Sequence, residues 1–211
     1  MSLFWTHRDF DIAETLARRV RLLSLAQICR IWWPQARSPR IVRRRLGRLA
    51  AGGLVHRAIV NVHPPLDVSR PLAAWQPTEA EPDFLEVSVR AKARWRETSG
   101  PQELFFATRL AANLFGSTAG QLPALNHRDH DLLLGQVYAL YRATRPAAAR
   151  EWVGEDSLPK AGYRIKDPDA FLVDASGSLL RVIESAGRYS AAQCHSFHEH
   201  CAEHDLPYEL W

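Results

Sequence analysis

An aspartate and a glutamate stand at matching ends of two predicted strands joined by a short turn. Residues 169–174 alternate as a strand does, residues 175–178 are typical of a turn, and residues 179–184 predict a buried strand. Antiparallel pairing would bring Asp169, at the start of the first strand, close to Glu184, at the end of the second. Two adjacent carboxylates can hold Mg²⁺ or Mn²⁺, and such an ion polarises a scissile phosphate and generates hydroxide. The pair is therefore a candidate metal-binding and catalytic site.

This stretch resembles the PD-(D/E)xK nuclease superfamily. In that superfamily a lysine two residues after the glutamate stabilises charge and orients water, whereas this chain has Ala186 there. Arg188 is the nearest cation and would complete the catalytic set if it folds back, although a guanidinium is too basic to accept a proton. Lys160 and Lys166 are further candidates. Two other interpretations stay open: a degenerate nuclease-like domain kept for DNA binding or dimerisation, and a structural turn cap beside an exposed strand end.

A second group of residues has the chemistry of DNA binding. Arg40, Arg43 and Arg44 share one face of a helix predicted over residues 39–51. An α-helix fits the major groove, where a guanidinium can bind phosphate or guanine. Two residues precede this helix at the point where a phosphate would meet its N-terminus, and two more lie on the strand that follows. The full set of expected DNA-binding residues is Arg37, Ser38, Arg40, Arg43, Arg44, His56 and Arg57.

The charge of the chain is divided unevenly along its length. Residues 1–62 hold twelve arginines, no lysine and three acidic residues, a balance of +9, so with a net charge of +4 the remainder carries −5. A basic segment of this kind is typical of a polyanion-binding protein. The alternative is a solvated basic helix in a module that binds another protein.

The elements that must position these arginines follow the order of a winged helix-turn-helix. Hydrophobic spacing predicts helices over residues 11–23, 25–33 and 39–51, with Ser38-Pro39 as the start signal of the third and Gly52-Gly53 as its end. A strand is predicted over residues 55–62, and residues 71–76 are expected to return as the second strand of the wing. Three helices followed by a strand pair, with a short turn between the second and third helices, predict a DNA-binding fold.

The rest of the chain predicts a small α/β domain. Helices are expected over residues 84–97, 103–114, 129–144 and 189–203, and short strands over residues 151–153 and 208–211. From residue 129 the order is helix, strand, strand hairpin, helix, strand, which suits a mixed sheet of restriction-endonuclease-like architecture. The expected class is α+β, with a winged helix domain over 1–77, a helical connector over 78–125 and a nuclease-like domain over 126–211.

Three short motifs extend the resemblance over most of the chain. They are His130-Asp131-Leu132 at the start of a predicted helix, Pro168-Asp169-Ala170, and Val182-Ile183-Glu184. Together with the N-terminal winged helix, they resemble the replication-relaxation proteins of plasmids and other mobile elements. The resemblance implies a role in mobile-element replication or transfer, and it implies that His130 lies near the acidic cluster.

The remaining features set the expected class of protein. No apolar run is long enough for a membrane helix, and the N-terminus lacks a signal pattern, so we expect a cytoplasmic protein without membrane contact. Cys194, His198 and Cys201 share a helical face and could bind zinc, but a buried apolar stripe explains them better. We expect a double-stranded DNA-binding protein of mobile-element replication or transcriptional control, and a homodimer that reads paired half-sites. A metal-dependent endonuclease and a non-catalytic assembly factor are the alternatives.

Overall fold

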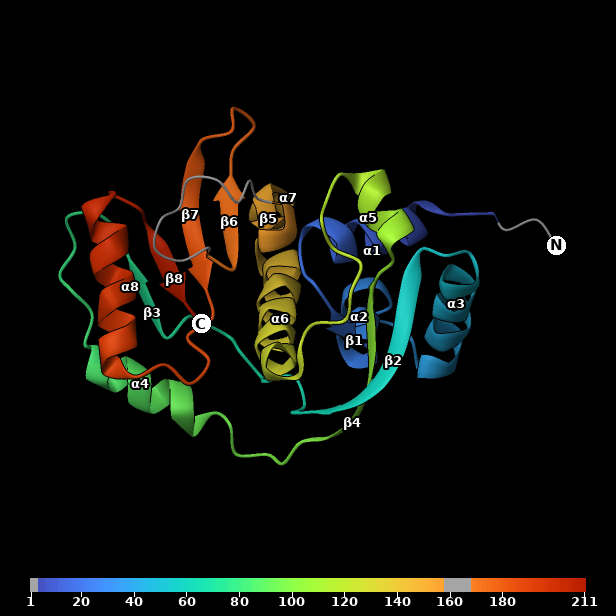
Figure 1. Ribbon diagram of the computed structural model, residues 1–211, viewed down its shortest axis with the longest axis horizontal. Helices are drawn as coiled ribbons and strands as arrows, with labels where there is room; N and C mark the ends of the chain where they lie inside the picture. The colour runs from blue at the N-terminus through green and yellow to red at the C-terminus, as the bar shows by residue number, and fades with distance from the viewer. Residues whose placement is uncertain (1–3, 158–167) are drawn as a thin grey trace.

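The computed structural model describes residues 4–157 and 168–211, which form an α+β fold with two sheets (Figure 1). One sheet has three strands and the other has five, and the larger sheet is mixed. Within the described ranges, no helix has the length and apolar character needed to cross a membrane.

The N-terminal body combines three helices with the smaller sheet. Helices α1 (His7–Arg18), α2 (Leu25–Trp32) and α3 (Pro39–Ala51) are packed against strands β1 (Leu23–Ser24), β2 (Val55–Val62) and β4 (Gly100–Ala107). Side-chain caps define the starts of these helices: Thr6, Ser24 and Ser38 each accept a backbone N–H at a helix N-terminus. The predicted bounds of the third helix and of the strand after it are confirmed.

The partner of strand β2 is not the segment that the sequence suggested. Strand β4 pairs with β2 along its whole length, from Val55 opposite Ala107 to Val62 opposite Gly100. The expectation of a wing strand over residues 71–76 is wrong, since β3 (Ala73–Trp75) pairs instead with β8 (Tyr208–Leu210) in the larger sheet. The helix expected over residues 103–114 is also wrong in its first half. The chain there is strand β4, and helix α5 (Arg109–Phe115) begins only after it.

The C-terminal body is built on the larger sheet. Its strands lie in the order β3-β8-β7-β6-β5, where β5 is Trp152–Gly154, β6 is Ala170–Val173 and β7 is Leu179–Glu184. Strands β7 and β8 are parallel and the other pairs are antiparallel. Helix α8 (Ala191–Glu203) lies beside α4 (Phe84–Ala93) at one side of the sheet (Figure 1). The expected order of helix, strand, hairpin, helix and strand is confirmed.

One segment of chain crosses from the N-terminal body to the C-terminal body and returns. Residues 63–99 leave the end of β2, add β3 to the larger sheet, place α4 beside α8 and return to β4. The expected boundaries at residues 77 and 125 therefore do not separate the two sheets, because the region between them supplies both α4 of the C-terminal body and β4 of the N-terminal body.

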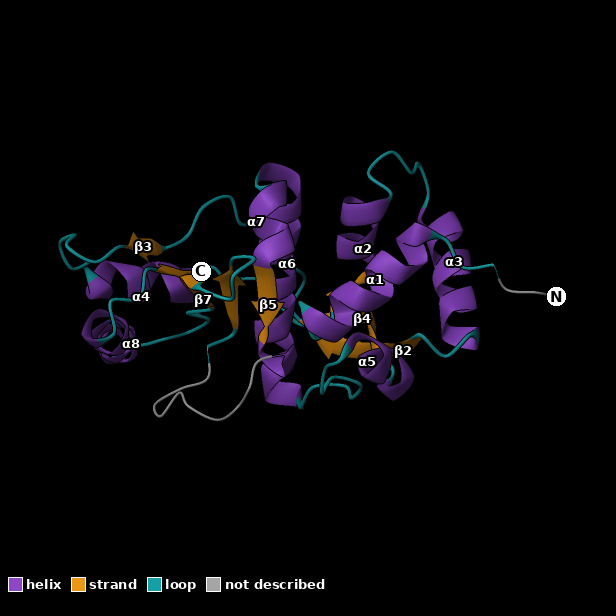
Figure 2. Cartoon of the chain, turned by 90° about the horizontal axis from the view of Figure 1, so that it is seen from above, coloured by secondary structure: helices purple, strands orange, loops and turns teal. Residues whose placement is uncertain are grey.

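Helix α6 (Arg128–Thr144) stands between the two sheets, continued by the short helix α7 (Pro146–Glu151) (Figures 1 and 2). Its side chains Leu133, Val137 and Tyr141 belong to one hydrophobic core that extends from α1 and α3 to Ile183 and Trp211. Asp11 of α1 also accepts two hydrogen bonds from Arg142, at 3.0 and 2.9 Å. The N-terminal and C-terminal bodies are therefore joined through α6.

Gly154 offers a direct test of the contact between the bodies. A Cβ at this position would lie 2.4 Å from the backbone oxygen of Arg19, which cannot move without shifting the main chain. We expect Gly154→Ala to lower the free energy of unfolding by about 1–3 kcal/mol, the usual cost of overpacking, as measured by urea denaturation.

Gly47 supplies the matched control. It lies inside α3 with nothing within 4 Å of an added Cβ, so Gly47→Ala should raise stability by about 0.5–1 kcal/mol through lower backbone entropy. Equal stability of the Gly154→Ala variant and the wild type would contradict this close contact.

Candidate functional site

The outer face of α3 carries exposed arginines. Ser38 begins the helix by accepting a hydrogen bond from the Arg40 backbone N–H at 3.3 Å. Within residues 4–157 and 168–211, no hydrogen bond or ion pair engages the guanidinium groups of four arginines in or just before this helix, which are Arg37, Arg40, Arg44 and Arg48. These charges are therefore available to an external anion.

A groove lies beside this face of the helix. It has a volume of about 530 Å³ and is lined by Arg44 and Arg48 from α3 and by Arg8 from α1. The Arg8 guanidinium lies 4.6 Å from the centre of the Trp33 ring, which also lines the groove. The Ile41 side chain, 55% exposed, is a further part of its wall. The groove thus combines positive charge with apolar surface.

Glu103 links α3 to the neighbouring strand pair β2–β4. Glu103 of β4 accepts a hydrogen bond from Nε of Arg43 at 2.7 Å and another from Nε of Arg57 on β2 at 2.6 Å. Burial alone would raise the pKa of Glu103, but the two ion pairs outweigh it and hold the pKa below its usual value. Of the expected DNA-binding residues, Arg43 and Arg57 are therefore partly neutralised. His56 is exposed on β2, with its ring 5.1 Å from that of Phe106.

Three other N-terminal arginines are used inside the protein. Arg45 of α3 forms an ion pair with the buried Asp9. Arg19 donates to three backbone oxygens of residues 149, 150 and 152, the shortest at 2.7 Å. Arg21 pairs with two acids of the C-terminal body. The excess of positive charge at the N-terminus therefore serves internal contacts as well as the exposed helix face.

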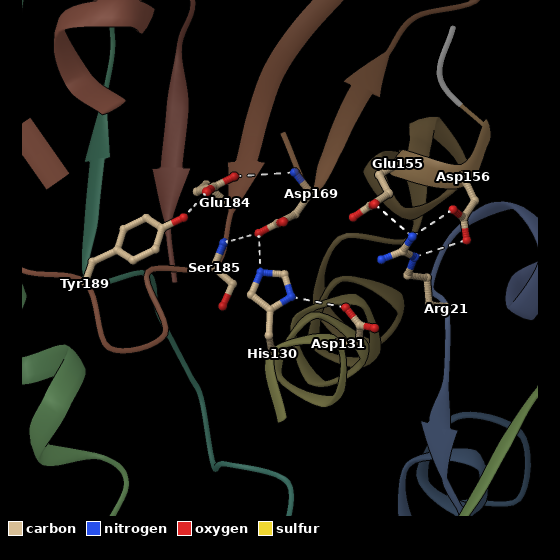
Figure 3. Close-up of polar contacts among 9 residues, drawn as sticks. All are labelled: Arg21, His130, Asp131, Glu155, Asp156, Asp169, Glu184, Ser185 and Tyr189. Carbon is tan, nitrogen blue, oxygen red and sulfur yellow. Dashed lines mark hydrogen bonds and ion pairs between the residues drawn. The ribbon is translucent and has the colours of Figure 1, made fainter. Parts of the chain in front are cut away.

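The acidic pair of the predicted hairpin comes together as its register requires. Ala170 lies opposite Ile183 across β6 and β7, so that Asp169 and Glu184 meet at one end of the hairpin (Figure 3). The Asp169 backbone N–H donates to Oε2 of Glu184 at 3.4 Å, and the Tyr189 hydroxyl donates to Oε1 at 2.6 Å. Oδ2 of Asp169 accepts the backbone N–H of Ser185 at 2.6 Å. Both acids are buried.

His130 is the cation of this site. It reaches from the first turn of α6, with Nε2 at 3.0 Å from Oδ2 of Asp169 and Nδ1 at 3.1 Å from Oδ1 of Asp131 (Figure 3). Burial disfavours the charged ring, but the two carboxylates outweigh it and raise the pKa of His130 to about 11. At neutral pH the ring is therefore an imidazolium that donates one hydrogen bond to each acid.

Further acids adjoin the site at the junction with the N-terminal body. Arg21 forms a two-pronged pair with Asp156, at 3.1 Å for both bonds, and lies 3.0 Å from Oε1 of Glu155 (Figure 3). Burial raises the pKa of Glu155 to about 6, with the Asp169 carboxylate adding to the effect and Arg21 opposing it. The backbone N–H of Glu155 also donates to the backbone oxygen of Asp169 at 3.1 Å. The two groups of acids thus form one connected network.

As arranged, these residues do not fit a divalent metal ion. Oδ2 of Asp169 already accepts two hydrogen bonds, one of them from the His130 cation. The positive charge of His130 would repel a metal cation at the same carboxylate. Among the residues that the structure describes, no group of three or more histidine, cysteine, aspartate or glutamate side chains is placed to hold a metal. In this arrangement the pair is engaged by His130, Tyr189 and backbone N–H groups, and the expected magnesium or manganese site stays a prediction.

The expected third catalytic residue lies elsewhere. The Arg188 guanidinium is placed over the Trp95 ring, 5.3 Å from its centre, so it is not positioned as a replacement for the missing lysine. Lys160 and Lys166 lie outside the described residues. Sequence reasoning did not identify Ser185 and Tyr189, which follow Glu184 in the chain, as partners of the pair. It also missed Asp131 and Arg21, which tertiary folding places beside His130 and Glu155.

The cysteines of α8 belong to a hydrophobic core. Cys194, Phe197 and Cys201 are buried together with Tyr208, as the apolar-stripe interpretation predicts. Burial raises the pKa of the Cys201 thiol to about 12, so it stays protonated at neutral pH. Nδ1 of His198 lies 3.0 Å from the Tyr208 hydroxyl. These contacts do not favour zinc at this helix.

Comparison with known proteins yields no relative. No family model matches the sequence, no curated protein matches it, and no solved structure matches the fold. The resemblance to replication-relaxation proteins stays a prediction.

We expect the His130 ring to remain doubly protonated from pH 6 to about pH 9, well above the ordinary histidine pKa near 6.5. Because the folded-state pKa is raised, the stabilisation by this charge is complete below about pH 6.5 and is lost as the pH rises toward about 11. Long-range ¹H–¹⁵N NMR spectra would show both ring nitrogens protonated, with His130→Gln used to assign the signals.

The same ring in the urea-unfolded chain is the reference, and it should titrate near pH 6.5. A folded-state midpoint close to that of the unfolded chain would show that the two carboxylates do not hold the charge.

Proposed function

We propose that this protein binds double-stranded DNA through a winged helix-turn-helix formed by its N-terminal body. Helix α3 is the helix that enters the major groove, and the antiparallel strand pair β2–β4 is the wing. The observation that carries this proposal is the row of exposed arginines on α3 that have no internal acidic partner in the described chain.

The contacts around α3 support this proposal in two ways. First, Arg40 lies in the first turn of the helix, the part that meets base edges in helix-turn-helix complexes. Second, Glu103 of β4 forms ion pairs with Arg43 of α3 and with Arg57 of β2, which connects the helix to the strand pair. DNA phosphates can then be contacted from both elements at once.

The C-terminal body is proposed to be a nuclease-like module that supports DNA binding without cutting. Its order of helix, strand, hairpin, helix and strand favours this architecture, and its acidic pair is occupied by His130 and Tyr189. We further propose a cytoplasmic role in mobile-element replication or transcriptional control, with a homodimer reading paired half-sites.

A metal-dependent endonuclease is the second candidate function. The meeting of Asp169 and Glu184 at the hairpin end is the observation that favours it. The hydrogen bonds of His130 and the placement of Arg188 argue against it.

Replacement of Arg40 and Arg44 together by alanine should weaken binding to a duplex of about 25 base pairs. We expect an affinity loss of about 10- to 100-fold at low salt, and a decrease of about two in the slope of log affinity against log salt, because two phosphate contacts are removed. Fluorescence anisotropy at several salt concentrations measures both quantities. Neither side chain has an internal partner in the described ranges, so the fold should be unchanged.

Arg150→Ala is the matched control, since Arg150 is exposed on α7, far along the chain from α3. This variant should retain the wild-type affinity and salt slope. Equal losses in both variants would indicate a general charge effect, and absence of duplex binding by the wild type would refute the proposed function.

Supercoiled plasmid incubated with the protein and Mg²⁺ or Mn²⁺ should remain uncut, since Asp169 is held by a cation of the chain itself. Gel electrophoresis checks this, with Asp169→Asn and Glu184→Gln as controls for a contaminating nuclease. Nicking that the wild type performs and both variants lose would instead establish the endonuclease.

A further inference from the structure

A second cavity lies between the two chain segments that cross from one body to the other. It has a volume of about 630 Å³. Residues 63–70, on the way from β2 to β3, form one wall, and residues 93–97, on the way from α4 to β4, form the other. The cavity is separate from the groove beside α3, since the two share no lining residue.

Arg94 is the unusual residue in its wall. This arginine ends helix α4, and its Nε and Nη2 atoms are buried without a hydrogen-bond partner in the described part of the chain. Burial, with the nearby Arg90 charge as a second cause, lowers the pKa of Arg94 to about 10, so the group is still charged at neutral pH. Buried charges in proteins are normally paired. Arg94 as a whole is half-buried and lines the cavity, so an anion from outside the chain can approach its guanidinium.

The other charged residues of the cavity add to the positive potential. Arg70, Arg90 and Arg96 also line it, against the acids Asp67 and Glu97. Arg90 is oriented by the Leu72 backbone oxygen at 3.4 Å and by Glu86 at 3.3 Å, and Nε of Arg96 donates to the Ala93 oxygen at 2.9 Å. Arginines in excess over acids, with planar donor forks, are suited to phosphate oxygens.

We propose that this cavity binds a phosphate group, with Arg94 as the central donor and Arg70 at the entrance. The phosphate belongs either to a free nucleotide or inorganic phosphate, or to the backbone of bound DNA. The site does not depend on the DNA interface proposed for α3, because it rests on different residues. Phosphate bound here would bridge the two crossing segments. The first of these segments is held to α6 by His63, whose Nδ1 lies 2.7 Å from Oδ2 of Asp129.

The test is thermal unfolding of the full chain in inorganic phosphate against chloride of equal ionic strength. The melting temperature of the wild-type protein should be higher in phosphate than in chloride, and this increase should be absent in Arg94→Met. In chloride alone, Arg94→Met should melt at the same temperature as the wild type or higher, because it removes a half-buried charge whose Nε and Nη2 atoms have no internal partner among the described residues. Arg150→Met is the control for the general stabilising effect of phosphate on folded proteins.

Arg70→Gln is a second variant that keeps the test decisive if Arg94→Met fails to fold. Arg70 is exposed, and the described residues provide its side chain with no hydrogen bond or ion pair, so its loss should reduce phosphate binding without disturbing the fold. Equal phosphate gains in the wild type, both cavity variants and Arg150→Met would overturn the proposal. Absence of any gain in the wild type would also overturn it.

Two further measurements distinguish the sources of the phosphate. If the source is DNA, Arg94→Met should lower duplex affinity and reduce the salt slope by about one. If the source is a free nucleotide, duplex binding should be unchanged, and adenosine monophosphate should raise the wild-type melting temperature at lower concentration than phosphate does. The Arg40/Arg44→Ala variant should keep its phosphate response in either case, which separates failure of this site from failure of the α3 interface.

Discussion

The arrangement of the whole molecule depends on how residues 19–21 sit against the C-terminal body. Arg19 donates to backbone oxygens where helix α7 passes into strand β5, and the Trp152 indole donates back to the Arg19 oxygen at 2.9 Å. Two residues later, Arg21 binds Asp156 and Glu155. Such a close approach of two backbones is possible only because residue 154 is glycine. This contact places the N-terminal helices at a fixed distance from the acidic hairpin.

As one consequence, the N-terminal arginines fall into two groups with different contacts. Between α1 and β1, Arg21 forms ion pairs with acids of the C-terminal body and Arg19 donates to its backbone oxygens. Partial burial strengthens these charged hydrogen bonds. On the outer face of α3, Arg40, Arg44 and Arg48 have no such partner in the described chain and remain solvated, whereas Arg43 pairs with Glu103. Net charge alone does not separate these two groups. The availability of an arginine for DNA depends on whether an acid of the same protein is within reach.

The elements that could be predicted from the sequence are those with local signals. Helix α3 is bounded by Ser38-Pro39 and Gly52, so both of its ends were predicted correctly. Helix α1 begins earlier than expected, although Thr6 and Asp9 form a capping box that could have revealed it. Strand β4 could not be predicted in this way, because its pairing with β2 spans the whole of residues 63–99. Strand pairing across such a distance leaves no periodic trace in the local sequence.

The same distinction holds for the acidic site. Asp169 and Glu184 could be paired from sequence because a short hairpin fixes their register. The partners that determine their chemistry are His130 of α6, which only the resemblance placed near the pair, and Tyr189, which follows Glu184 closely in the chain. His130 then changes what Asp169 can do, because its imidazolium lies between the carboxylates of Asp169 and Asp131 and supplies positive charge to both. With Asp169 held by His130 and Glu184 by the Tyr189 hydroxyl, the acidic pair can stabilise the hairpin end and its contact with α6 while the proposed DNA contacts are made elsewhere.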